Sequence, residues 1–315
     1  MKIPLFGGCG ALGVWAILVD NDVLFSERAM ESSLTTTQTP ERLMIGRPPI
    51  PREHGAWVIL YAPLVIGLAV AGRFEPVPTL LLALAVTGAY LARHAADLVL
   101  RRREQPGTRF WLGAFAAAFV AGGLPLIVAW HRTGLLWVGG AVGVLFSVHA
   151  GLTLRPARKR FDRTAAGELL AVAALVATGP AATSAVRGSL DSLAVSLWLL
   201  CALFFGSGVL HVNMYLDAAK MRGAFGPTER AQVSRPTLFY HIAFCVVFPL
   251  AAFVSLGGGI ATFVAVAGVL PAIVRAFAGI ATVSTTLPPL KRVGWQESAN
   301  ALWFSACLIA AFLLR

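Results

Sequence analysis

Residues 193–214, LAVSLWLLCALFFGSGVLHVNM, form an apolar stretch that contains no Asp, Glu, Lys or Arg. A helix needs about 20 predominantly apolar residues to cross the hydrocarbon core of a bilayer, whereas shorter runs are typical of buried core helices. The rest of the chain has a similar character, because 57% of its 315 residues are hydrophobic and only 13% are charged. The stretch predicts a transmembrane helix, and the composition predicts several more.

The quantity of apolar sequence sets the expected number of helices. About 180 apolar residues suffice for roughly nine spans of about 20 residues each. The composition excludes a soluble enzyme, a disordered chain and a secreted disulfide scaffold. We therefore predict an all-α, polytopic membrane bundle. The nine predicted spans are 56–72, 78–96, 110–130, 134–153, 166–186, 193–214, 237–256, 259–280 and 298–314.

The first 45 residues differ from the rest and predict a poorly structured N-terminal extension before a nine-helix membrane domain at 46–315. Residues 4–19 are apolar but too short for a comfortable span, which is typical of a weak signal-like segment. A true translation start at Met30 or Met44 would produce the same pattern. The functional analysis therefore begins after residue 45.

The charge distribution predicts the topology. A net charge of +11 would favour nucleic acid as the partner of a soluble protein, but in membrane proteins Lys and Arg collect in cytoplasmic loops. The loops after the second, fourth, sixth and eighth spans hold fifteen basic residues, whereas the alternate loops hold Arg73, Arg132 and Arg187. We predict a bacterial inner (cytoplasmic) membrane location, with the basic loops in the cytoplasm. The expected partners are membrane lipids and no nucleic acid, and protein partners stay undetermined.

Polar clusters lie where the spans meet the basic loops. A charged group at a helix centre costs on the order of 2.5–3.5 kcal/mol on insertion scales, so each cluster calls for a reason. The cluster at 47–57 is explained without a ligand as a flank of the first span, and the one at 155–170 as an ordinary basic loop. In the cluster at 90–103, Arg93, Asp97 and Arg101 share one helical face, where salt bridges would support the helix end. In the cluster at 210–223, Asn213 favours a functional site because a buried amide needs partners. The candidate substrate-binding residues in these clusters are Glu53, His54, Arg93, His94, Glu168 and His211.

Two further polar positions lie in the C-terminal third. Arg275 falls in the middle of the eighth span and is expected to pair with a carboxylate from another helix. Glu297 and Asn300 lie at the start of the ninth span.

Three segments resemble the bacterial YwiC-like membrane proteins. They are PREHGAWVILYAPL (51–64), GELLAVAALVATGPAA (167–182) and RVGWQESANALWF (292–304). The resemblance implies a membrane scaffold and does not imply an activity.

Nine spans, with polar clusters on the loops after the second and sixth spans, also resemble the UbiA-type intramembrane prenyltransferase superfamily. In that superfamily, Asn-Asp-x-x-Asp-x-x-x-Asp-like motifs bind Mg²⁺, and the metal coordinates an isoprenoid diphosphate. Asp97 matches the first motif, and Asn213 and Asp217 match the second. Other motif positions are occupied by Arg93, His94 and Arg101 in the first motif and by Met214 and Met221 in the second.

The UbiA-like resemblance implies catalytic roles for Asp97, Asp217 and Asn213, with Mg²⁺ on the two aspartates across a shared cytoplasmic cavity. The residues expected to clamp the diphosphate are Arg102, Lys159, Arg160 and Arg222. Because acids are missing from both motifs, arginines that bind phosphate without a metal are the alternative.

Three hypotheses for the function stay open. The first is binding of an isoprenoid diphosphate or anionic lipid at the cytoplasmic face, with prenyl transfer as the associated reaction. The second is a non-enzymatic assembly, lipid-binding or transport factor that has lost the metal site. The third is a purely structural bundle in which every polar group is paired internally.

Overall fold

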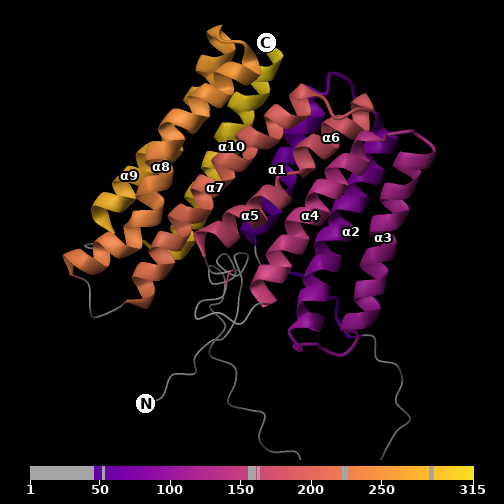
Figure 1. Cartoon of the computed structure of the whole chain (residues 1–315), viewed down its shortest axis with the longest axis horizontal. Coiled ribbons are helices and arrows are strands. Elements are labelled where there is room, and N and C mark those ends of the chain that lie inside the picture. The colour runs from indigo at the N-terminus through magenta and orange to yellow at the C-terminus, as the bar shows by residue number, and fades with distance from the viewer. Residues whose placement is uncertain (1–45, 52–53, 155–160, 162–163, 222–225, 284–286) are drawn as a thin grey trace, which may run out of the picture.

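A computed structural model describes residues 46–51, 54–154, 161, 164–221, 226–283 and 287–315 (Figure 1). The predicted extension at 1–45 lies outside these residues. The described part is helical and contains no strand, which confirms the all-α prediction. The helices are α1 (His54–Val70), α2 (Pro76–Leu100), α3 (Thr108–Val128), α4 (Gly134–Leu154), α5 (Ala165–Leu175), α6 (Thr178–Arg187), α7 (Ser192–Lys220), α8 (Pro227–Leu256), α9 (Gly259–Thr282) and α10 (Leu290–Leu313).

Each predicted span overlaps a helix, except that the fifth span is divided into α5 and α6. Helices α8 and α10 begin well before the spans predicted at 237–256 and 298–314. Within the described residues, seven helical segments are long and apolar enough to cross a membrane, with α5 and α6 together forming one of them. Helix α1 has only 17 residues, and the first turns of α10 carry Lys291, Arg292 and Glu297. The prediction of a polytopic helical bundle is confirmed, with seven rather than nine segments meeting both criteria.

The break between α5 and α6 follows from Pro180. Proline has no backbone N–H, so the Val176 carbonyl loses its ordinary helical donor and accepts instead from the Gly179 N–H at 3.0 Å. The Ala173 carbonyl accepts a hydrogen bond from the Trp198 indole on α7 at 2.8 Å. Neighbouring helices commonly satisfy freed backbone groups in this way within a membrane. The broken span is therefore stabilised by a hydrogen bond from the neighbouring helix α7.

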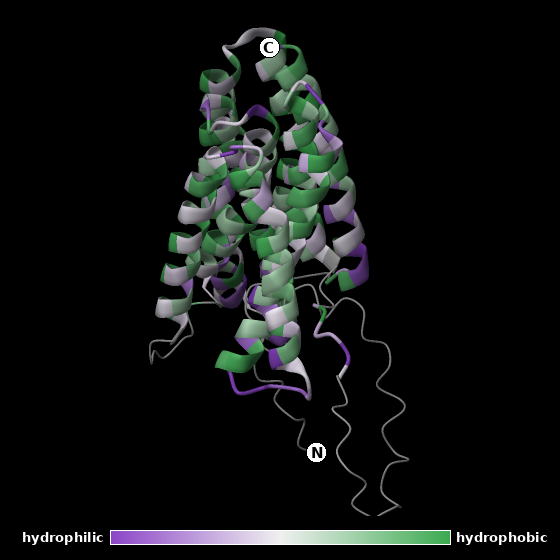
Figure 2. Cartoon of the chain, turned by 90° about the vertical axis from the view of Figure 1, so that its right-hand side faces the viewer, coloured by the Kyte–Doolittle hydropathy of each residue, from purple (hydrophilic) through white to green (hydrophobic). Residues whose placement is uncertain are grey.

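The centre of the bundle is formed by α5, α6 and α7, which are largely buried, whereas few residues of α4 are buried. Large apolar side chains also point outward, including Val254 at 82% exposure and Trp137 at 74%. Figure 2 shows hydrophobic residues along the helices and hydrophilic ones gathered toward the helix ends. An apolar outer surface of this kind suits contact with lipid chains.

Helices α1 and α6 approach closely because glycine lies at their crossing. A Cβ atom at Gly67 would lie 2.4 Å from the Gly179 carbonyl oxygen and 2.8 Å from Ala182 Cβ. Small residues allow this approach between membrane helices.

We therefore expect Gly67→Ala to destabilise the protein by about 1–3 kcal/mol through overpacking. Thermal unfolding in detergent measures this. The control is Gly143→Ala on α4, where an added Cβ meets no atom within 4 Å and alanine is the better helix former. Equal melting temperatures for the two variants would contradict the tight crossing.

Candidate functional site

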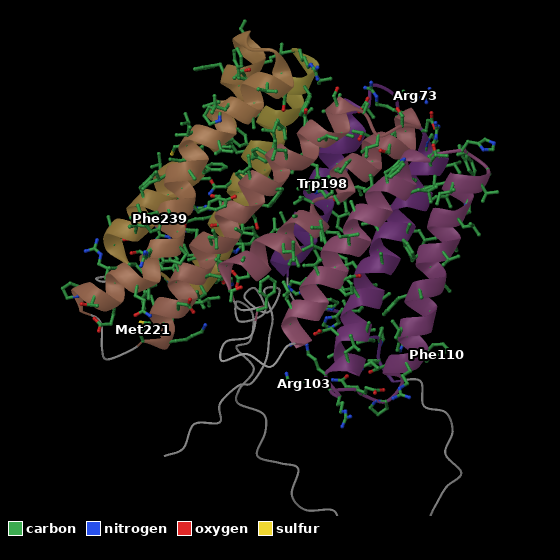
Figure 3. The ribbon with its side chains drawn as sticks, viewed as in Figure 1. Arg73, Arg103, Phe110, Trp198, Met221 and Phe239 are labelled. Carbon is green, nitrogen blue, oxygen red and sulfur yellow. The ribbon has the colours of Figure 1, made fainter. Side chains whose placement is uncertain are left out.

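The helix ends that border the four basic loops lie at one end of the bundle, which we call the basic end. It contains the last residues of α2, α4, α7 and α9 and the first residues of α3, α5, α8 and α10 (Figure 1). Figure 3 places Arg103 and Met221 at this end and Arg73 at the opposite end. The predicted alternation of loops is therefore present in the fold.

The arginines of the opposite end are neutralised by acids. Glu75 pairs with Arg73 at 2.9 Å and with Arg132 at 2.6 Å, and Arg187 pairs with Asp191 at 3.0 Å. Two acids thus face three arginines here, so the few cations at this end add little net charge.

At the basic end, both predicted metal ligands have basic partners on their own helices. Asp97 pairs with Arg101 at 2.6 Å, and Asp217 pairs with Lys220 at 2.7 Å. Helix α2 packs mainly against α3 and α6, whereas α7 packs mainly against α8, α6 and α5. Within the described ranges, no group of three or more His, Cys, Asp or Glu side chains could hold a metal ion.

An exposed ion pair closes the loop between α2 and α3. The Arg109 guanidinium donates two hydrogen bonds to the Glu104 carboxylate, at 2.7 and 2.9 Å, and this bonding lowers the pKa of Glu104. Arg102 precedes this pair at the tip of the loop.

Arg102 has an unusual backbone conformation at this tip. Its φ angle is +52°, in the left-handed region where glycine is usual after a helix. The turn ends α2 with hydrogen bonds from the Arg102 N–H to the Val99 carbonyl and from the Arg103 N–H to the Leu98 carbonyl. The Arg102 side chain is exposed and has no acidic partner among the described residues. An arginine kept where glycine would cost less is a candidate functional residue.

Two predicted residues that are far apart in the sequence meet between α5 and α7. The Asn213 amide donates a hydrogen bond to the buried Glu168 carboxylate. Glu168 lies in the first turn of α5, where a carboxylate is also stabilised by the helix dipole. The hydroxyl of Thr164 caps the same helix by accepting from the Gly167 N–H. Glu168 and Asn213 thus form a polar contact near the basic end.

The remaining described candidates lie apart from this contact. Arg93 lies over the Phe146 ring of α4 at 5.3 Å from its centroid, and His94 is half-buried on α2. His211 is fully buried with its ring edge-to-face against Tyr215. Only the backbone of His54 is described, as the first residue of α1. Four other candidates, Glu53, Lys159, Arg160 and Arg222, lie outside the described residues.

A second polar cluster lies deeper, between α7, α8, α9 and α10. Arg275 forms an ion pair with Glu297, and their side chains are only 12% and 10% exposed. This confirms the prediction that Arg275 pairs with a carboxylate from another helix. His241 belongs to the same region, bonded to the Ser207 hydroxyl at 2.8 Å and the Thr237 carbonyl at 2.7 Å.

Ser207, His241 and Tyr215 were not predicted from the sequence. The available signal is the spacing of Ser207, His211 and Tyr215 at i, i+4 and i+8, which places all three on one face of α7. Asn213 and Asp217 lie on a different face. Helix α7 therefore presents one polar face to α5 and another to α8–α10.

Comparison with known proteins relates part of the chain to a family. The YwiC-like protein family matches residues 50–183. The "Uncharacterized protein YwiC" of Bacillus subtilis (strain 168) is 27% identical over 174 residues, which are 55% of this chain and 69% of that protein. No solved structure matches, so the UbiA-like resemblance stays a prediction. Residues 50–183 are therefore similar to the YwiC-like family, as the passages at 51–64 and 167–182 predicted.

Proposed function

We propose that this multi-pass membrane protein binds an anionic lipid of the isoprenoid phosphate or diphosphate class at its basic end. The observation that carries the proposal is the charge arrangement of the two ends. Acids pair with the arginines at one end, whereas Arg102, Lys291 and Arg292 at the other have no acidic partner among the described residues. Guanidinium and ammonium groups bind phosphate strongly through charge-assisted hydrogen bonds.

In this proposal, basic side chains rather than a metal neutralise the phosphate. Asp97 and Asp217 are already engaged by Arg101 and Lys220, and Mg²⁺ demands nearly octahedral oxygen coordination. The described oxygen ligands do not assemble such a centre. We therefore place lipid binding first and treat prenyl transfer with Mg²⁺ as the alternative outcome of the experiment.

The experiment is reconstitution of the full chain in nanodiscs with a labelled polyprenyl diphosphate. Binding is measured with Mg²⁺ and then with a chelator, against polyprenyl alcohol and phosphatidylserine as competitors. We expect binding that survives chelation and is competed weakly by the alcohol, since the headgroup supplies the charge. Competition by phosphatidylserine as strong as by unlabelled diphosphate would reduce the proposal to general anionic-lipid binding. Release of diphosphate that requires Mg²⁺ would establish prenyl transfer instead.

Asp217→Asn distinguishes phosphate binding by basic side chains from phosphate binding by Mg²⁺. The Asp217–Lys220 pair is exposed, and such pairs contribute only about 0–1 kcal/mol to stability. The change also removes a negative charge near the ligand and frees Lys220, so diphosphate affinity should stay the same or increase. A large loss of affinity, together with full dependence on Mg²⁺, would show that a metal carries the phosphate.

The proposal also requires the basic end to face the cytoplasm. In a cysteine-free background, Gln105→Cys and Thr228→Cys at the basic end should resist an impermeant thiol reagent applied to intact cells. Ser189→Cys at the opposite end should react. Permeabilisation should expose the first two sites, and labelling of both without it would reverse the orientation.

A further inference from the structure

The buried cluster of α7, α9 and α10 contains polar atoms without hydrogen-bond partners. Nη1 of Arg275 and Oε1 of Glu297 form the ion pair, whereas Nε and Nη2 of Arg275 and Nδ1 of His211 form no hydrogen bond in the structure. Buried polar groups nearly always have partners, and ordered water supplies them where protein does not. The cluster therefore has the chemistry of a hydrated site.

Space for water exists beside Glu297. A cavity of about 20 Å³ between α1, α7 and α10 is lined by Glu297, Ser298 and Gly208, together with apolar side chains. This volume is enough for one water molecule. A Cβ atom at Gly208 would lie 2.8 Å from Glu297 Oε2. Glycine at this position therefore leaves space for the Glu297 carboxylate.

A second glycine, Gly279, leaves space for the His211 ring. A Cβ atom at Gly279 of α9 would lie 2.7 Å from His211 Cε1 and 2.8 Å from the Tyr215 hydroxyl oxygen. Two helices thus carry glycine where polar groups of the cluster approach them. The helix packing at these two glycines therefore depends on the polar side chains of the cluster.

The depth of the cluster separates it from the lipid site proposed above. Arg275 lies seven residues before the end of α9, and Glu297 lies seven residues after the start of α10. At 1.5 Å per residue, both are about 10 Å from the basic end. Ionisable groups inside membrane bundles commonly mark ion or proton paths.

We propose that Glu297, together with Arg275 and His211, forms a hydrated site that binds one exchangeable proton inside the bundle. The proton passes from a hydronium ion at the cavity to a carboxylate oxygen of Glu297, where an O–H bond forms and water remains. Arg275 cannot give up its proton in a protein, so the ion pair changes from neutral to a net charge of +1. The guanidinium is then released toward water.

The groups that face Glu297 support this assignment. Helix α9 contributes Arg275, and α7 contributes Tyr215 and, on the side of Arg275, His211. Helix α8 contributes His241, whose ring nitrogens are both hydrogen-bonded within the protein, and the residues of α1 that line the cavity carry no charge. Glu297 is therefore the acid of the cluster that borders the cavity, and His211 is the histidine with an unoccupied nitrogen.

The test is pH-difference infrared spectroscopy of the full chain in nanodiscs, recorded in H₂O and D₂O. We expect a protonated-carboxyl band that appears on acidification, shifts in D₂O and disappears in Glu297→Gln. The matched control is Glu104→Gln, which removes an exposed carboxyl at the same end of the bundle and should leave the infrared band unchanged. In Arg275→Gln, the band should appear at a pH higher by about one unit or more, because the carboxylate loses its cation.

Arg275→Lys keeps the charge and tests the same point if Arg275→Gln does not fold, because its band should stay near the wild-type pH. A band that persists in Glu297→Gln would overturn the proposal. So would the absence of any such band at every pH at which the wild-type protein stays folded. Neither result bears on diphosphate binding, so the two proposals fail separately.

Discussion

Glu297→Leu should destabilise the helix bundle by about 3–5 kcal/mol, because it leaves the buried Arg275 without its carboxylate. Arginine cannot escape this cost by losing its proton, since its guanidinium stays charged in proteins. Arg275→Met should cost less, because the remaining Glu297 can become neutral by taking up a proton. Unfolding by sodium dodecyl sulfate in mixed micelles measures both variants.

The double variant Arg275→Met/Glu297→Leu is the control for this prediction. Replacing a buried ion pair with apolar residues of similar volume is often neutral or stabilising, so the double variant should recover most of the stability lost in Glu297→Leu. Equal losses in all three variants would mean that packing around the two side chains, rather than their charges, determines stability. The order expected here depends on the charges alone.

The helices could be predicted from the sequence because the length of an apolar run is a local property. The runs at 193–214 and 259–280 correspond to α7 and α9. The division of the fifth span was not predicted, although Pro180 was visible, because membrane helices often continue past a proline. Here the break at Pro180 is accompanied by a hydrogen bond from Trp198, which lies on a different helix, to the Ala173 carbonyl.

The candidate site was predicted less completely, because it depends on partners between helices. The cost of a charge at membrane depth correctly predicted a carboxylate partner for Arg275. For Asp97, helical spacing favoured Arg101 as a local partner and the family resemblance favoured a metal; the structure contains the local pair. The contact of Asn213 with Glu168 could not be derived, because no spacing rule relates residues on α5 to residues on α7.

Arg102→Gly should weaken diphosphate binding and at the same time stabilise the fold. Arg102 holds a φ of +52°, and glycine adopts this conformation without the penalty of about 1–2 kcal/mol that a Cβ causes. The variant should therefore be more stable by about 1 kcal/mol, as measured by thermal unfolding. Loss of one charged hydrogen bond to phosphate costs about 1.5–3 kcal/mol, which corresponds to an affinity loss on the order of 10- to 100-fold in nanodiscs.

His131→Gly is the matched control for Arg102→Gly, because His131 also has a φ of +52° but lies after α3 at the opposite end. It should gain similar stability, since the same backbone strain is released, and it should bind the labelled diphosphate as the wild type does. Wild-type affinity in Arg102→Gly would remove this arginine from the proposed site. Equal losses of affinity in both variants would assign the effect to helix ends in general. Only a stability gain shared by both, with an affinity loss confined to Arg102→Gly, supports an arginine retained for its charge at the expense of the fold.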